Sequence, residues 1–328
     1  MQAESLHPLR FDPIIKELIW GGRRLGTILN KPLGSGTQYA ESWEISDHRN
    51  DVSRVVHGRL QGSNLRELLR DRGEEVLGTA VGQRDQFPLL VKYIDAQQTL
   101  SVQVHPDDAL GKRLANDNGK TETWVVLHNE PGSFIYAGLK QGVTRKDFAK
   151  ALESGDVEPL LHCFEAKAGD CIMIPAGTMH AIGAGVLLAE IQQMSDATFR
   201  VHDWGRVGPD GKPRQLHLDE ALESTNFEAG PVEPLSATPE AIQGGTREQL
   251  SHCPFFSLQR LKLNGPARLG DGQRFNILLG LKGSVDVIHE GERTPLKFGE
   301  TLLLPASLGA CEVVPQQGEA EVLTCVVP

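Results

Sequence analysis

The stretch Gly169-Asp170-Cys171-Ile172-Met173-Ile174-Pro175-Ala176 has the order of a glycine turn, a short apolar strand and a proline turn. The same order returns at Gly299-Glu300-Thr301-Leu302-Leu303-Leu304-Pro305-Ala306, turn for turn and strand for strand. Short apolar runs separated by such turns are typical of small β-sandwiches and barrels. The repeat therefore predicts two β-rich units built on a similar scaffold.

Length and composition agree with two β-rich domains. The chain has 328 residues, more than one typical domain of about 150, and its 35 glycines and 19 prolines favour many turns. The segment 230–245 is rich in Pro, Gly, Ser and Thr and is the best candidate for a linker between the two domains. We therefore predict a larger domain with added helices over 1–229, a linker over 230–245 and a second domain over 246–328.

Charge and cysteine content narrow the functional classes. A net charge of −10 argues against binding to nucleic acid or an anionic membrane, since both need clustered Lys and Arg. No apolar run reaches the roughly 18 residues of a membrane helix, and Met1–Arg10 lacks a signal-peptide core, so we expect a cytoplasmic protein. The five cysteines are odd in number and form no C-x-x-C pair, which predicts reduced thiols rather than a zinc-thiolate site.

Hydrophobic periodicity places the main elements. The expected strands are Tyr39–Ile45, Phe87–Ile94, Thr121–Leu127, Cys171–Ile174 and Val186–Gln193. The expected helices are Asn64–Leu77, Thr144–Leu152 and His217–Asn226, with a shorter helix capped by Asp107 or Asp108 and running to about Ala115. The segment Leu6–Ser46 is otherwise loop-rich.

The stretch Leu100–Asp108 carries the first candidate site residues. Read as a strand, its alternation puts Ser101, Gln103 and His105 on one face, and Pro106 then stops a central strand. An amide oxygen and an imidazole two residues apart on one face can reach a single metal ion. The alternative is an amphipathic strand with a solvated polar face, and an isolated Q-x-H motif does not decide between them.

Glu122 and His180 are candidates for the remaining ligands. Glu122 lies in an apolar strand, where a charge costs several kcal/mol unless it is paired or bound to a cation; pairing with Lys120 is the alternative. His180 lies eleven residues after Gly169, whereas Ala310 lies eleven residues after Gly299. The scaffold repeats and the histidine does not, although His180 could also be a turn histidine. Oxygen and nitrogen donors without a thiolate suit Zn²⁺, with Mn²⁺, Fe²⁺ and Co²⁺ as alternatives.

The polar segment Ala189–Arg206 follows an apolar strand and has two interpretations. As structure, it is a loop held by side-chain hydrogen bonds and an Asp196–Arg200 pair. As function, it is a substrate wall, with Arg200 as a planar fork for an anion or developing enolate and Glu190 as a proton-transfer carboxylate.

Taken together, these motifs resemble the type I mannose-6-phosphate isomerases (phosphomannose isomerases) of the shorter bacterial kind, in the cupin superfamily. The combination of Q-V-H-P, K-x-E, P-x-G-x-x-H and S-D-x-x-x-R carries the resemblance, over Phe87–Asp108, Gly119–Trp124, Pro175–Gly183 and Glu190–Arg206. Two departures stand out: the long helical insertion of larger members has no room here, and Thr121 occupies a position that is often proline.

The resemblance implies two cupin-type jelly-roll β-barrels with a few peripheral helices, the first catalytic and the second without metal. It implies one zinc ion per chain, with Gln103, His105, Glu122 and His180 as ligands. Arg200 matches the active-site arginine, Lys120 the lysine beside the metal-binding acid, Glu190 a proton-transfer residue and Ser101 a serine near the substrate phosphate. We expect a monomer or homodimer.

The implied reaction interconverts mannose 6-phosphate and fructose 6-phosphate through a cis-enediol. Glu190 is the preferred base, with metal-bound water and His105 as competitors. Two alternatives stay open: an Fe(II) cupin dioxygenase, against which Gln103 argues because the usual triad is two histidines and one carboxylate, and a sugar-phosphate-binding regulatory protein without catalysis.

Overall fold

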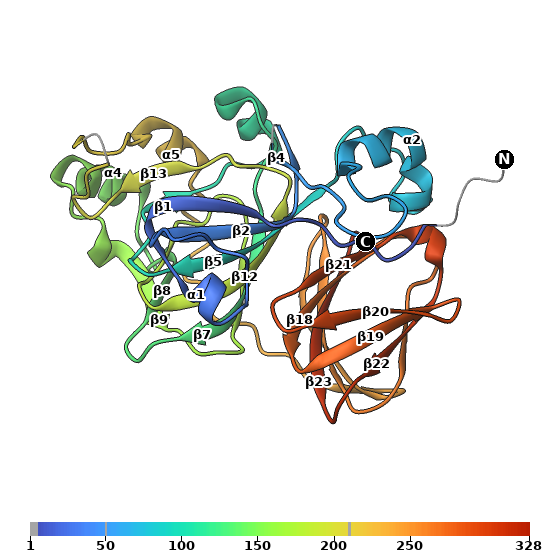
Figure 1. Cartoon of the computed structure of the whole chain (residues 1–328). Helices are drawn as coiled ribbons and strands as arrows, with labels where there is room; N and C mark the ends of the chain where they lie inside the picture. Colours follow the sequence, from blue (N-terminus) through green and yellow to red (C-terminus); the bar gives the residue numbers. More distant parts are fainter. Residues whose placement is uncertain (1–5, 50, 209–210) are drawn as a thin grey trace.

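The computed structural model describes residues 6–49, 51–208 and 211–328, so the first five residues of the predicted first domain lie outside it. The chain is mainly β and forms two sandwiches of antiparallel sheets, shown side by side in Figure 1 with the C-terminal one in orange and red. In the described residues the two sheets of each unit are separate, so each of the expected jelly rolls has the form of a sandwich. No helix in these residues has the length and apolarity needed to span a membrane.

The first sandwich contains two sheets of six and five strands. In spatial order the first sheet is β1 (Ile14–Gly22), β2 (Tyr39–Ile45), β5 (Leu89–Ala96), β12 (Val186–Gln193), β7 (Glu122–Asn129) and β10 (Cys171–Ile174). The second sheet is β13 (Phe199–His202), β6 (Val102–Val104), β11 (His180–Ile182), β8 (Phe134–Leu139) and β9 (Leu161–Glu165). A two-stranded hairpin of β3 (Asp47–His48) and β4 (Asp51–Val52) lies beside them.

The second sandwich contains sheets of six and four strands. The larger sheet is β14 (Glu240–Ile242), β15 (Gly245–His252), β16 (Ser257–Leu263), β23 (Ala320–Val326), β18 (Asn276–Lys282) and β21 (Thr301–Leu304). The smaller sheet is β17 (Ala267–Leu269), β22 (Cys311–Pro315), β19 (Ser284–His289) and β20 (Glu292–Lys297). Strand β14 lies within the segment predicted to be a linker. It pairs there with β15 through a tight turn.

The helices are peripheral, as expected, and three of them (α2, α3 and α4) follow a residue whose side chain caps them. They are α1 (Arg24–Thr27), α2 (Leu65–Leu77), α3 (Asp108–Leu110), which continues as a π turn over Gly111–Ala115, α4 (Arg145–Ser154) and α5 (Leu218–Ser224), with 3-10 turns at Glu158–Leu160 and Ala306–Leu308. Asn64 and Thr144 form capping boxes, and the Asp107 side chain caps α3.

The structure confirms the repeat and corrects two element predictions. Strands β10 and β21 occupy the two copies, and each pairs with the strand three places earlier in the chain, β7 and β18 respectively. The predicted strand at Leu100–His105 is shorter, Val102–Val104. The prediction of loops up to Ser46 missed β1, because two register shifts break its alternation of polar and apolar residues.

Buried contacts join the two sandwiches. The rings of Phe87 and Phe275 lie 4.8 Å apart, and both side chains are fully buried. Leu9, near the N-terminus, exchanges two backbone hydrogen bonds with Leu303 of β21, so the N-terminal segment extends the sheet of the second sandwich. Folding of the second sandwich therefore contributes to burial of the first.

Replacing Phe275 by alanine opens a cavity at this contact, and we expect it to lower the free energy of unfolding by about 3–5 kcal/mol. Denaturant titration measures the change. Phe134→Ala is the matched control, because Phe134 is 45% exposed and its removal leaves no buried cavity. Equal effects of the two substitutions would contradict a shared core.

Candidate metal centre

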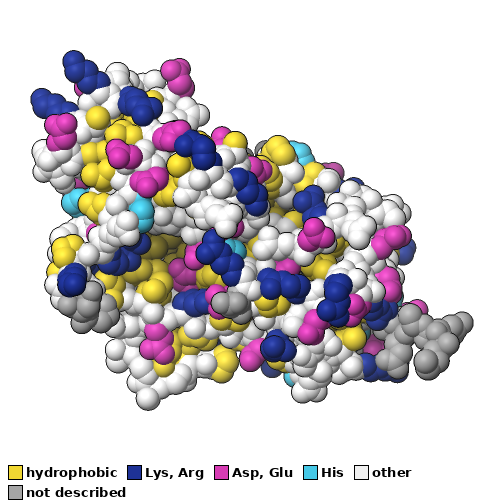
Figure 2. All heavy atoms as spheres, turned by 90° about the horizontal axis from the view of Figure 1, so that it is seen from above, with side chains coloured by type: hydrophobic (Ala, Val, Ile, Leu, Met, Phe, Trp, Pro, Cys, Tyr) yellow, Lys and Arg dark blue, Asp and Glu magenta, His cyan; other side chains and the backbone are white. Residues whose placement is uncertain are grey.

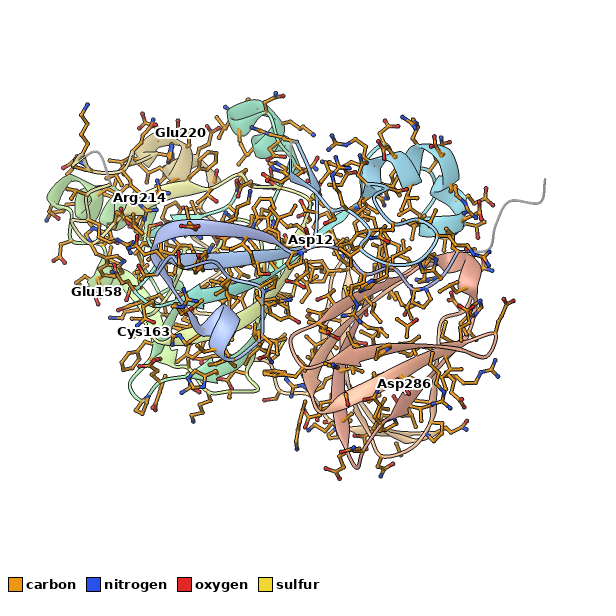
Figure 3. The ribbon with its side chains drawn as sticks, viewed as in Figure 1. Asp12, Glu158, Cys163, Arg214, Glu220 and Asp286 are labelled. Atoms are coloured by element: carbon orange, nitrogen blue, oxygen red, sulfur yellow. The ribbon has the colours of Figure 1, made fainter. Side chains whose placement is uncertain are left out.

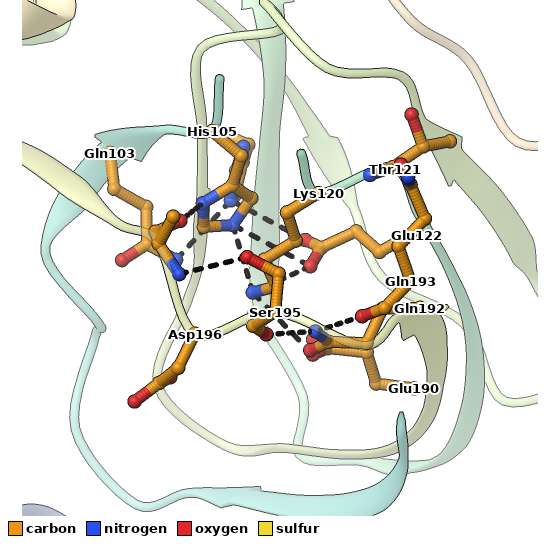
Figure 4. A network of polar contacts seen from close by, with 12 residues as sticks. Gln103, His105, Lys120, Thr121, Glu122, Glu190, Gln192, Gln193, Ser195 and Asp196 are labelled. Atoms are coloured by element: carbon orange, nitrogen blue, oxygen red, sulfur yellow. Dashed lines mark hydrogen bonds and ion pairs between the residues drawn. The ribbon is translucent and has the colours of Figure 1, made fainter. Parts of the chain in front are cut away.

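The predicted ligands come together between the two sheets of the first sandwich. Arg200, Gln103 and His180 are cross-strand neighbours on β13, β6 and β11, so three strands bring them into one row. Glu122 begins β7 on the opposite sheet, and Figure 4 shows it facing His105 across the site. Among residues 6–49, 51–208 and 211–328, the buried group His105, Glu122 and His180 is the one whose ligand atoms lie close enough to hold a metal ion together.

The spacing of the donor atoms fits one ion. A four-coordinate ion with bonds of about 2.1 Å holds its ligand atoms about 3.4 Å apart. Nε2 of His105 lies 3.5 Å from Glu122 Oε2, and Nε2 of His180 lies 3.5 Å from Glu122 Oε1. The Gln103 amide nitrogen lies 3.2 Å from His180 Nε2, and rotation of this amide would present its oxygen instead. All four predicted ligands therefore lie within reach of one position.

Both histidines have their Nε2 lone pairs turned toward the site. Nδ1 of His105 is 2.9 Å from the carbonyl oxygen of Ala197, and Nδ1 of His180 is 2.9 Å from that of Thr178. Each carbonyl fixes the proton on Nδ1 and leaves Nε2 as the acceptor. Burial and the nearby Lys120 charge lower the pKa of His105 to about 3, and burial also lowers that of His180. Neutral imidazoles are the form that binds metal.

Glu122 is fully buried, and its surroundings agree with both interpretations of its charge. Lys120 Nζ lies 2.8 Å from Oε2, which is the ion pair considered as an alternative. Neither carboxylate oxygen accepts a well-directed hydrogen bond, however, which leaves both free to bind a cation. Burial alone would raise the pKa of Glu122, but Lys120, His105 and His180 outweigh it and hold that pKa well below its usual value.

Glu190 lies next to the ligand cluster on β12. Lys92 Nζ is 3.0 Å from Oε1 and Lys120 Nζ is 3.7 Å from it, while the Trp124 indole donates to Oε2 over 2.9 Å. Burial and the charge of Glu122 raise the pKa of Glu190, and the two lysines only partly offset this. A buried carboxylate with a raised pKa, held by the Trp124 indole and the charge of Lys92, is suited to proton transfer.

Lys92 is a residue that the sequence interpretation missed. It stands in an apolar strand, is only 4% exposed, and also lies 3.5 Å from Glu41 Oε2 on β2. Burial lowers the pKa of Lys92, but Glu190 and Glu41 outweigh it and raise that pKa, so the side chain is charged. The signal available was a lysine inside an otherwise apolar strand.

Arg200 lines a cavity of about 650 Å³ at the end of the sandwich. Its Nε donates to Ser101 Oγ over 3.2 Å and its Nη1 to the Gln215 carbonyl over 2.9 Å, so the expected pair with Asp196 is wrong.

Lys212 and Arg214 line the same cavity as Arg200, and Figure 3 labels Arg214 at this end of the molecule. Figure 2 shows a hollow on one face with Lys and Arg side chains around it. Ser101 is only 4% exposed.

Comparison with known proteins agrees with this arrangement. Residues 9–121 match the family model for the catalytic domain of phosphomannose isomerase type I, and residues 246–325 match that for the cupin domain of mannose-6-phosphate isomerase. Mannose-6-phosphate isomerase ManA of Bacillus subtilis (strain 168) is 35% identical over 328 residues, which cover 98% of this chain and 99% of that protein.

Solved structures extend the comparison. A crystal structure of the mannose 6-phosphate isomerase from Bacillus subtilis has a TM-score of 0.89 and 30% identity, covering 98% of this chain and 99% of that one. A mannose 6-phosphate isomerase bound with zinc and yttrium has a TM-score of 0.78 over 97% and 99% of the two chains, but only 17% identity, so it shares the fold. Fold and site thus define a cupin-type sandwich protein with a candidate metal centre. The chain belongs to the type I mannose-6-phosphate isomerase family.

Removal of a ligand should remove the ion. We expect Glu122→Gln and His180→Ala to lose stoichiometric metal, since each leaves the ion with fewer anionic or imidazole donors. Arg200→Ala is the control, because it keeps every donor and should keep the metal while turnover falls. Elemental analysis of the purified proteins measures the content, and a His180→Ala protein that is active without metal would contradict the assignment.

Proposed function

We propose that this chain interconverts mannose 6-phosphate and fructose 6-phosphate, with Gln103, His105, Glu122 and His180 holding one zinc ion. The observation that carries the proposal is the position of Glu190, a carboxylate with a raised pKa, joined through Lys120 to a cluster of neutral imidazoles and an anionic acid. Zinc is favoured over Mn²⁺, Fe²⁺ and Co²⁺ by the tetrahedral spacing of the nitrogen and oxygen donors, and by the zinc in the related structure of the same fold.

The proton transfer is assigned to Glu190. The open-chain aldose loses its C2 proton to the Glu190 carboxylate while O1 gains one, and the resulting cis-enediol receives a proton at C1 as O2 loses its own. The Trp124 indole donates to one carboxylate oxygen and the Lys92 ammonium lies beside the other, which limits the orientations that the acid can take toward the carbon atoms. Lys120 supplies a positive charge beside the sugar oxygens.

The developing charge on the sugar oxygens needs stabilisation. A zinc ion supplies Lewis-acid polarisation of the carbonyl when bound. Arg200 is the cross-strand neighbour of Gln103, and one well-directed donor of this kind contributes about 2.7–4 kcal/mol to lowering a barrier. Arg200, with Ser101 behind it, also lies at the cavity that would admit the phosphate, where Lys212 and Arg214 add positive charge.

The two other activities are less well supported. His105, His180 and Glu122 alone would match the triad of an iron dioxygenase, but Gln103 adds a fourth donor and the full-length relatives are isomerases. A binding protein without catalysis has no need of Glu190 held between Lys92 and Lys120. We further propose that the enzyme acts in the cytoplasm as a monomer or homodimer on this small anionic substrate.

The direct test is turnover before and after chelation. Purified protein should convert mannose 6-phosphate to fructose 6-phosphate in a coupled assay, lose this activity when the metal is removed, and regain it with one equivalent of zinc per chain. Oxygen uptake with added Fe²⁺ would support the dioxygenase instead, and binding of either sugar phosphate without turnover would support the regulatory protein.

Substitution Glu190→Gln tests the base. We expect exchange of the C2 proton with solvent to fall by about 10²- to 10⁴-fold, because general-base catalysis contributes on that scale. In the unsubstituted enzyme kcat/KM should decline as the pH falls through the raised pKa of Glu190, above its ordinary value of 4.5, because protonation removes the base. Metal content measured at each pH is the control. Exchange retained by Glu190→Gln would assign the role to metal-bound water or His105.

A further inference from the structure

We propose that Asp117, held by His48, is a positioning residue that orients the ligand His105 through the turn 195–197. The inference rests on the proposed metal centre and extends it to residues that do not touch the ion. Its path contains two steps, from His105 to the carbonyl of Ala197 and from this turn to the Asp117 carboxylate.

The first step fixes the ring of His105. Its Nδ1 donates to the Ala197 carbonyl oxygen over 2.9 Å, and both residues are buried. The position of that one oxygen sets the rotation of the imidazole and therefore the direction of the Nε2 lone pair. Partners of this kind behind a metal-bound histidine set its tautomer and orientation.

The second step fixes the carbonyl. The backbone N–H of Asp196 donates to Asp117 Oδ2 over 3.0 Å. The N–H of Ala197 donates to Ser195 Oγ over 3.1 Å, and that hydroxyl donates to the Asn118 carbonyl over 2.8 Å. Gln192 Nε2 donates to the Ser195 carbonyl over 2.6 Å, a contact drawn in Figure 4. The turn thus lies between the loop carrying Asp117 on one side and His105 on the other.

Asp117 is itself rigidly held. Nε2 of His48 lies 3.0 Å from Oδ2, and the N–H of Asn118 donates to Oδ1 over 2.8 Å. Asp117 is 8% exposed and His48 is 5% exposed. Burial alone would raise the pKa of Asp117, but the hydrogen bonds from His48, Asp196 and Asn118 lower it to about 2, so its carboxylate stays an acceptor. The contact between His48 and Asp117 thus links the hairpin β3–β4 to the metal centre.

Asp117→Asn tests the inference. The amide replaces one acceptor oxygen by a donor. With its nitrogen at the place of Oδ2, the N–H of Asp196 in the turn loses its acceptor; with its nitrogen at the place of Oδ1, the N–H of Asn118 does, and Asn118 is the residue whose carbonyl holds Ser195 of the turn. We expect zinc affinity, measured by competition with a chromophoric chelator, to fall about 10- to 100-fold. The visible absorption spectrum of the Co²⁺-substituted protein should also change, because it reports the geometry of the ligands. Thermal unfolding of the metal-free protein measures the purely structural effect.

Asp95→Asn is the matched control. Asp95 is a fully buried carboxylate that accepts the backbone N–H of Arg24 over 2.7 Å and its guanidinium over 2.8 Å, away from the turn. Its substitution should lower the melting temperature and leave zinc affinity and the Co²⁺ spectrum unchanged. Ser195→Ala releases the same turn by another route, and we expect a smaller fall in zinc affinity in the same direction, which keeps the test available if Asp117→Asn does not fold.

The outcomes distinguish the positioning role of Asp117 from the metal centre itself. Zinc affinity and Co²⁺ spectra like those of the wild-type chain in Asp117→Asn and Ser195→Ala would overturn the positioning role while leaving the metal centre intact. An equal loss of zinc affinity in Asp95→Asn would assign the effect to general loosening and also overturn it. A wild-type chain that binds neither Zn²⁺ nor Co²⁺ overturns the metal centre, and this inference with it.

Discussion

The negative charge of Glu122 is the constraint on which the first sandwich depends. A carboxylate with no exposed surface is costly to bury, and removal of its compensation would leave an isolated charge between two sheets. Lys120 and two imidazoles surround it, and they come from both sheets of the sandwich. The sandwich therefore has to hold its sheets at a separation that keeps these groups together, which is also the separation that an ion would need.

Glu122 is the last residue in a row of alternating acidic and basic side chains. Acidic and basic side chains follow one another from β2 to β7, through buried contacts, in the order Glu41, Lys92, Glu190, Lys120, Glu122. Glu190 and Glu122 are both buried, yet their pKa values move in opposite directions, because Lys120 lies 2.8 Å from Glu122 but 3.7 Å from Glu190, and Glu190 has the negative Glu122 as a neighbour. Neighbouring charges, rather than burial, separate a metal-binding acid from a proton-transferring one.

The second sandwich shows what the scaffold does without this chemistry. Strand β21 repeats β10. Eleven residues after the glycine that precedes each strand, the second sandwich has Ala310 where the first sandwich has His180. The second sandwich contacts the first: it packs Phe275 against Phe87 and pairs β21 with Leu9. These contacts stabilise the residues just before β5, the strand that carries Lys92. The division of the chain at 229 and 246 stays a prediction, and strand β14 of the second sandwich lies within the predicted linker.

The sequence by itself determined the β class, the repeat, the strands Tyr39–Ile45, Cys171–Ile174 and Val186–Gln193, and the cap of the short helix α3 at Asp107, one of the two residues predicted for it, because these depend on local periodicity and turn chemistry. It also singled out His105, Glu122 and His180 as candidates. Only the tertiary structure decided which of them meet, that Lys92 joins Glu190, that Arg200 bonds Ser101 rather than Asp196, and that Asp117 reaches His105 through a turn. The physical reason is that cross-strand register and the facing of two sheets bring together residues far apart in the chain, and no local pattern encodes those distances.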